Sequence, residues 1–76
     1  MIAFIVCKLA ASHESAALVK IKQIPCVKDV YLTFGAWDAV VIAEAPTMDK
    51  LSSLVVREVR NIEGVQNTET LITTNF

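Results

Sequence analysis

The sequence predicts one α+β domain in which strands and helices follow in the order βαββαβ. Three observations support this class. The 76 residues suffice for one domain, apolar spacing switches between strand and helix periods, and the two halves repeat weakly at an offset of 38 residues. In that repeat, Ile24 and Val27 correspond to Ile62 and Val65. Two strand–helix–strand units make the ferredoxin-like arrangement, a four-stranded antiparallel sheet with two helices on one face.

The first half of the chain carries the signals of a strand, a helix and a second strand. The dense β-branched and aromatic run from Ile2 to Leu9 predicts a strand with both faces buried. A helix is expected to begin with Ser12 as its N-cap, to carry Glu14 in its first turn and to end at Pro25. Val27 to Phe34 alternates as a second strand would.

The second half begins with a short connection that contains glycine, Gly35-Ala36-Trp37-Asp38, and this pattern predicts a β-hairpin. The third strand is expected over Ala39 to Ala45. Thr47 is the expected N-cap of a second helix. Gly64 marks the turn after that helix, and a threonine-rich fourth strand is expected over Val65 to Thr74.

The expected sheet has more apolar surface than a domain of this size can hide. Hydrophobic residues make up 54% of the chain and charged residues only 20%. The first and third strands are apolar on both faces, whereas the helices cover only one face of the sheet. We therefore expect the uncovered face to pack on the same face of a second copy, as a two-fold homodimer or dimeric α+β barrel.

Composition disfavours several classes of function. The net charge is −1 and no basic patch occurs, which argues against direct nucleic-acid binding. The N-terminal apolar run is too short for a signal peptide or a membrane span, so a cytoplasmic protein is expected. Cys7 and Cys26 are expected to be buried free thiols. His13 is the single histidine, and neither metal-ligand spacing nor a glycine-rich phosphate motif occurs, so no cofactor is expected.

The connection Gly35–Asp38 is the strongest candidate for a binding site. Its backbone N–H groups suit a carboxylate and the Asp38 side chain suits an ammonium, and an α-amino acid carries both groups. The alternative is an ordinary hairpin in which Trp37 packs on a neighbour and Asp38 bonds its own backbone. Thr70 and Thr73 either contact a ligand or a second subunit, or reflect the β-propensity of threonine.

Three stretches of the chain are similar in sequence to a known family of domains. They are residues 24–31 (IPCVKDVY), residues 35–41 (GAWDAVV) and residues 62–72 (IEGVQNTETLI). Together they resemble the effector-binding domain, or RAM domain, of the Lrp/AsnC (feast/famine) regulators. The resemblance covers essentially the whole chain. It implies sheet dimers that assemble further, often as a ring of four dimers, and amino-acid binding at contacts between dimers.

The resemblance also implies roles for particular residues and shows where the chain departs from the family. It implies that Gly35 to Asp38 supplies ligand contacts, that Arg60 faces the ligand, and that a neighbouring dimer completes the site. The family's helix-turn-helix is absent, so residues 1–76 are expected to be a stand-alone single domain without direct operator binding. Cys26 stands where glycine is common in the family, and Trp37 is bulkier than the tyrosine or histidine often found there.

The leading hypothesis is a non-enzymatic, amino-acid-sensing oligomer. It would regulate transcription or amino-acid metabolism through protein partners, with a full-length Lrp/AsnC regulator as one candidate. A second hypothesis is a purely structural oligomerisation module, in which Trp37 is buried in a subunit contact. A third is a cofactor-free enzyme with a dimeric α+β barrel. It is disfavoured because the region between sheet and helices is predicted to hold only apolar side chains.

Overall fold

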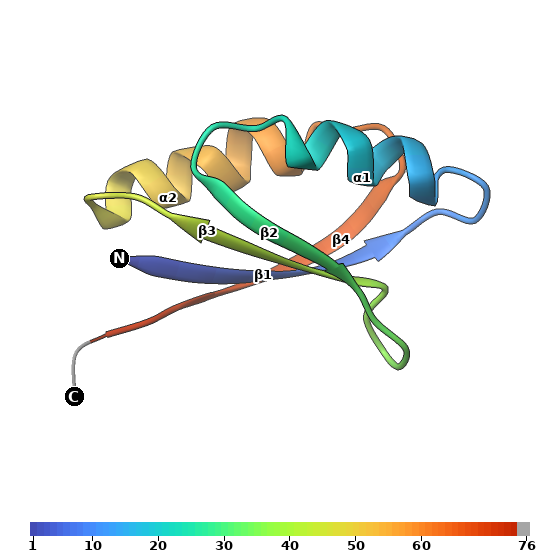
Figure 1. Cartoon of the computed structure of the whole chain (residues 1–76), viewed down its shortest axis with the longest axis horizontal. Coiled ribbons are helices and arrows are strands. Elements are labelled where there is room, and N and C mark those ends of the chain that lie inside the picture. The colour runs from blue at the N-terminus through green and yellow to red at the C-terminus, as the bar shows by residue number, and fades with distance from the viewer. Residues whose placement is uncertain (75–76) are drawn as a thin grey trace.

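The computed structural model describes residues 1–74, and in it two helices cover one face of a four-stranded antiparallel sheet (Figure 1). Its elements, in chain order, are β1 (Ile2–Leu9), α1 (Glu14–Lys22), β2 (Val27–Leu32), β3 (Ala39–Glu44), α2 (Met48–Leu54), the π-helical turn η1 (Val55–Val59) and β4 (Val65–Ile72). The strand order is β2-β3-β1-β4. The predicted ferredoxin-like fold is therefore confirmed, with both helices on one face.

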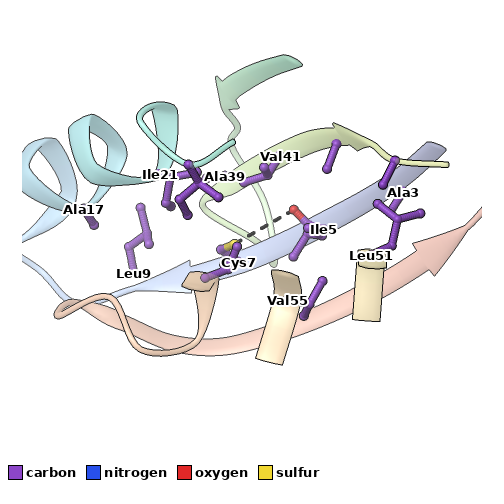
Figure 2. Close-up of a cluster of buried hydrophobic side chains, with 14 residues drawn as sticks. Ala3, Ile5, Cys7, Leu9, Ala17, Ile21, Ala39, Val41, Leu51 and Val55 are labelled. Atoms are coloured by element: carbon purple, nitrogen blue, oxygen red, sulfur yellow. Dashed lines mark hydrogen bonds between the residues drawn. The ribbon is translucent and has the colours of Figure 1, made fainter. Parts of the chain in front are cut away.

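The core lies between the helices and the sheet, and alternation along the two central strands builds it. Ala3, Ile5 and Cys7 of β1 are fully buried, while the intervening Phe4 is not. Ile5 lies opposite Val41 of β3 in the antiparallel ladder. Figure 2 shows these side chains directed toward residues of the helices. Because strand side chains alternate between faces, each central strand supplies every second residue to this core.

The two cysteines have different environments, which corrects one expectation. Both are free, but only Cys7 is buried, whereas Cys26 is exposed. The Cys7 sulfur lies 3.9 Å from the Ile5 carbonyl oxygen, the contact drawn as a dashed line in Figure 2. Burial disfavours the thiolate and raises the pKa of Cys7 from 9.0 to about 11. Cys7 therefore behaves as a small core residue.

One predicted helix cap is confirmed and the other is wrong. The Thr47 hydroxyl accepts a hydrogen bond from the Lys50 N–H at 3.2 Å, as expected of an N-cap. Ser12 instead has a positive φ of 72°, outside the extended region that an N-cap residue usually adopts. His13 occupies the N-cap position of α1 and makes no side-chain cap bond. The reason is a tight turn before the helix, closed by a bond from the His13 N–H to the Ala10 carbonyl at 3.1 Å.

The strands and the second helix differ from prediction at their ends. β2 ends at Leu32 rather than at the predicted Phe34. β3 ends at Glu44 rather than at Ala45, and β4 ends at Ile72 rather than at Thr74. The second helix begins as the α-helix α2 and continues as the π-helical turn η1. At its end the Arg60 N–H donates to the Val55 carbonyl at 3.2 Å. This five-residue spacing is that of a π-helix.

The face of the sheet away from the helices carries an apolar centre. Cross-strand neighbours place Phe4 beside Ile42 and Leu71, and Tyr31 beside Val40. Of these, Phe4, Tyr31 and Leu71 are 36%, 54% and 55% exposed. We refer to this surface as the outer sheet face. Large apolar surfaces of this kind are typical of protein contacts, so the face is consistent with the predicted homodimer, which stays a prediction.

Candidate ligand-binding site

The connection between β2 and β3 is a closed hairpin loop at one end of the sheet. The Thr33 N–H donates to the Asp38 carbonyl at 2.9 Å, and the Thr33 hydroxyl donates to the Trp37 carbonyl at 2.7 Å. Gly35 has a φ of +132°, a conformation that favours glycine. Figure 1 shows the loop projecting from the sheet on the side away from the helices. The sequence-predicted residues Gly35, Ala36, Trp37 and Asp38 thus lie together in one ordered turn.

Asp38 joins this loop to the central strand. Its Oδ2 accepts a hydrogen bond from the Leu9 N–H at 2.8 Å, and its own N–H donates to the Cys7 carbonyl at 2.8 Å. Leu9 lies at the register shift between β1 and β4, where the ladder is irregular. The carboxylate therefore satisfies a backbone donor of a neighbouring strand, rather than one of its own loop.

A hollow lined by Arg60 and hydroxyl side chains lies between the second helix and β4. It has a volume of about 310 Å³ and contains Arg60. Its wall combines three hydroxyl side chains with three apolar side chains, namely Ser52, Thr68 and Thr70 with Val55, Val56 and Ile72. We call this hollow the Arg60 groove. The Arg60 Nε donates to the Thr68 hydroxyl at 3.1 Å, which holds the guanidinium at the groove.

The charge of the Arg60 groove is positive. None of its lining residues is a carboxylate. Within residues 1–74, the ion pairs are His13 with Glu63 and Lys28 with Glu44, each at 3.8 Å, and neither involves Arg60. A cation beside hydroxyl groups, without a counter-charge from the same chain, suits an anionic ligand group.

The structure brings together only some of the sequence-predicted site residues. Arg60 and Thr70 share the Arg60 groove. None of the four residues of the Gly35–Asp38 loop lines this groove. Thr73 lies near the start of β1, where its N–H and its hydroxyl both donate to the Ile2 carbonyl, at 2.9 and 3.0 Å.

Sequence reasoning missed two hydroxyl residues of the groove. Thr68 lies two positions before Thr70 in β4, so strand alternation places both on the same face. Ser52 lies eight positions before Arg60, a spacing that returns to roughly one helix face. These two spacings identify Thr68 and Ser52 as site residues only once Arg60 is known to lie beside β4.

The internal repeat supplies a second groove at the equivalent place. A hollow of about 290 Å³ lies between α1 and the edge strand β2, and Lys22, Val30 and Leu32 contribute to its lining. These three residues precede Arg60, Thr68 and Thr70 by the repeat offset of 38 residues. A cation lies in both grooves, but Val30 and Leu32 replace the two threonines, and the hydroxyl-bearing residue of the second groove is Tyr31. The two grooves have the same architecture and different chemistry.

Two other kinds of site were searched for in the described part of the chain. Among residues 1–74, no three His, Cys, Asp or Glu side chains are grouped so that they could hold a metal ion. In the same residues, none of the helices has both the length and the apolar character needed to cross a membrane.

The comparisons with known proteins agree on one family. A family model described as the Lrp/AsnC ligand binding domain matches residues 3–75. No curated protein matches the chain. Among solved structures, FFRP-DM1 is 30% identical, with 96% of this chain and 97% of that chain covered and a TM-score of 0.90.

Two further structures place the match in context. The hypothetical protein PHS023 from Pyrococcus horikoshii is 30% identical, with 100% of this chain and 93% of that chain covered and a TM-score of 0.89. AsnC from E. coli is 26% identical, with 99% of this chain and 51% of that chain covered and a TM-score of 0.90. The chain therefore corresponds to about half of AsnC and to nearly all of the two smaller proteins.

Proposed function

Because this chain belongs to the Lrp/AsnC ligand-binding domain family, we propose that it senses an α-amino acid and couples its binding to assembly. The family match makes it a ligand-sensing regulatory domain in general terms. The observation that carries the finer proposal is the Arg60 groove. A guanidinium and three hydroxyls border an apolar wall there, and this combination suits a small molecule with a carboxylate and an apolar part.

The complete site is proposed to form between copies of the chain. In one chain none of the residues Gly35 to Asp38 lines the Arg60 groove, so a ligand that touches both is proposed to be shared by two copies. The loop projects beyond the sheet, and Phe34 beside it is fully exposed, at 107%. An apolar side chain in that position is suited to insertion into a neighbouring subunit. In this proposal the outer sheet face forms the contact within a dimer, and the Gly35–Asp38 loop forms a second contact between dimers.

Regulation follows from the difference in ligand affinity between assembly states. A ligand held at a contact between dimers favours the assembled state by as much as it binds that state more tightly. The change in assembly would act on transcription or amino-acid metabolism through protein partners, and a full-length Lrp/AsnC regulator is a candidate partner because it shares this domain. We place this activity in the cytoplasm.

Calorimetry against the twenty amino acids tests the proposal. The panel includes L-methionine, because NMB0573 of Neisseria meningitidis, which shares the fold at 18% identity, was solved in complex with L-Met. At least one amino acid is expected to bind. Arg60→Ala is expected to weaken binding at least about tenfold, the typical value of a charge-assisted hydrogen bond. Lys22→Ala, in the equivalent groove, is the matched control and is expected to leave affinity unchanged.

The role of the loop needs a variant that spares the fold. Asp38→Asn keeps an oxygen that accepts from the Leu9 N–H and removes only the charge, whereas Asp38→Ala removes both. Weaker amino-acid binding in Asp38→Asn would support a direct contact from the loop. Absence of binding by every amino acid in the wild-type chain would contradict the sensor.

A purely structural oligomerisation module is the second candidate. It is favoured by the hydrogen bonds of Asp38 and Thr73, both of which serve the backbone of β1. This candidate predicts stable assembly with no amino-acid binding. A catalytic role is not proposed, because the matching family model describes a ligand-binding domain.

A further inference from the structure

We propose that the Tyr31 hydroxyl donates a hydrogen bond to a carboxylate of a second copy of the chain across the outer sheet face. By symmetry the dimer then carries two such phenol–carboxylate bonds, one from each copy. The proposal rests on the dimer contact of the proposed function, and it names the polar groups that fit this face to a second copy.

Two rows of side chains cross the outer sheet face from one edge strand to the other. Each row is a series of cross-strand neighbours, Tyr31-Val40-Val6-Glu69 in the first row and Asp29-Ile42-Phe4-Leu71 in the second. The residues that alternate with them in the central strands are buried under the helices, so both rows point away from the helices. The middle of each row is apolar, and the polar groups stand at the row ends.

The three polar side chains at the row ends have no partner in their own chain. Within residues 1–74, the Tyr31 hydroxyl and the carboxylates of Asp29 and Glu69 make no hydrogen bond or ion pair. All three residues are exposed, and Tyr31 stands at the rim of the face, where it also borders the hollow beside α1. A subunit that covers the face removes the water around these groups. It must therefore supply a hydrogen-bond partner in exchange.

A two-fold axis through the apolar centre supplies that partner. Aligned packing of two sheets leaves two directions for the axis, along the strands or across them. An axis along the strands lays β2 over β4 of the partner, and Tyr31 then lies opposite the partner's Glu69. An axis across the strands lays β2 over β2 and exchanges the two rows, and Tyr31 then lies opposite the partner's Asp29. In both arrangements the phenol meets a carboxylate.

This complementarity favours a second copy over an unrelated apolar surface. An apolar peptide or a lipid surface would cover Asp29 and Glu69 without a donor, and burial of an unpaired carboxylate is costly. A second copy sets a phenol donor opposite a carboxylate twice, and hydrogen bonds to a charged acceptor are the stronger kind. The other carboxylate of each copy lies opposite the partner's Leu71 on an edge strand, so it keeps contact with water at the rim.

A double-mutant cycle on the dimer tests the proposal. Sedimentation equilibrium of the intact chain gives the Kd of the dimer, and concentration-dependent urea unfolding gives it for a dimer that dilution does not dissociate. Tyr31→Phe is expected to raise this Kd at least about tenfold, because both phenol–carboxylate bonds are lost. In the Glu69→Ala or the Asp29→Ala background, whichever lacks the accepting carboxylate, Tyr31→Phe is expected to change Kd less than about threefold. Glu58→Ala removes an exposed carboxylate from η1 and is the control, with an unchanged Kd.

The outcomes separate this inference from the proposed function. A Tyr31→Phe effect that disappears in either background supports the bond, and the carboxylate concerned gives the direction of the two-fold axis. A dimer whose Kd changes less than about threefold in Tyr31→Phe, or an effect that persists in both backgrounds, overturns the bond and leaves the dimer and the amino-acid sensor intact. A wild-type chain that stays monomeric contradicts both the inference and the dimer contact of the proposed function.

Discussion

Cys26 and Gly64 occupy equivalent positions in the two halves of the chain. They are 38 residues apart, each precedes a strand, and both have positive φ, 77° for Cys26 and 100° for Gly64. A side chain in the left-handed region costs roughly 1–2 kcal/mol, and glycine avoids this cost. The first turn therefore carries a conformational strain that the second turn does not.

Exchanging these two residues has opposite expected effects. Cys26→Gly is expected to raise the free energy of unfolding by about 1 kcal/mol, because the strain is released. Gly64→Ala is expected to lower it by more than that, since a Cβ at Gly64 would lie 2.8 Å from the Cβ of His13 at a positive φ. Urea denaturation measures both. A Cys26→Gly variant that is less stable than the wild type would contradict the strain.

The two thiols are expected to differ in reactivity and in pH response. At pH 8 a disulfide reagent should modify Cys26 rapidly and Cys7 only on unfolding, because Cys7 is buried. The folded pKa of Cys7, about 11, lies above the ordinary 9.0, so the folded state holds its proton more tightly than the unfolded state. This contribution is complete below pH 9 and is lost as pH rises toward 11. Cys7→Ala should flatten that fall in stability, and rapid modification of two thiols in the native protein would contradict the assignment.

Asp38 is expected to stabilise the fold as well as to face a ligand. Asp38→Ala leaves the Leu9 N–H without its acceptor, so we expect a loss of roughly 1–3 kcal/mol in the free energy of unfolding. Asp38→Asn is expected to lose less, because an amide oxygen replaces the carboxylate oxygen. Equal losses in the two variants, measured by thermal and urea unfolding, would show that the charge rather than the acceptor matters.

At the scale of elements, local signals located the strands and helices but not every boundary. Thr47 and Ser12 have the same preference for N-cap positions, and only Thr47 makes the cap bond. Ser12 is displaced because the Ala10 N–H bonds the Gly64 carbonyl at 2.7 Å, and this contact between distant turns fixes the entry to α1. The π-helical turn was also unpredicted, because apolar spacing does not distinguish one inserted residue near the end of a helix.

The cap difference can be measured directly. Thr47→Ala is expected to lower the free energy of unfolding by about 1 kcal/mol, the usual value of an N-cap bond. Ser12→Gly is the matched substitution at the other helix and is expected to be neutral or stabilising, because Ser12 has a positive φ. A destabilisation of similar size in both variants would contradict the difference between the two helix starts.

At the scale of the whole molecule, sequence patterns were sufficient for the topology and insufficient for the site. Apolar residues on both faces of the central strands predicted the helix-covered core and the outer sheet face around Phe4 and Leu71. The site was harder because its parts lie on different elements. Thr68 approaches Arg60 only when β4 lies beside the second helix, and the Asp38 bond to Leu9 joins residues 29 positions apart.

The most direct test of the account is the molar mass of the chain, measured by light scattering with and without the amino acids that bind in calorimetry. The wild type is expected to be a dimer or larger and to change its mass when ligand is added, while Arg60→Ala keeps one mass. Phe4→Asp, which places a charge on the outer sheet face, is the control and is expected to be monomeric. A wild-type mass that stays the same with every amino acid would contradict ligand-controlled assembly.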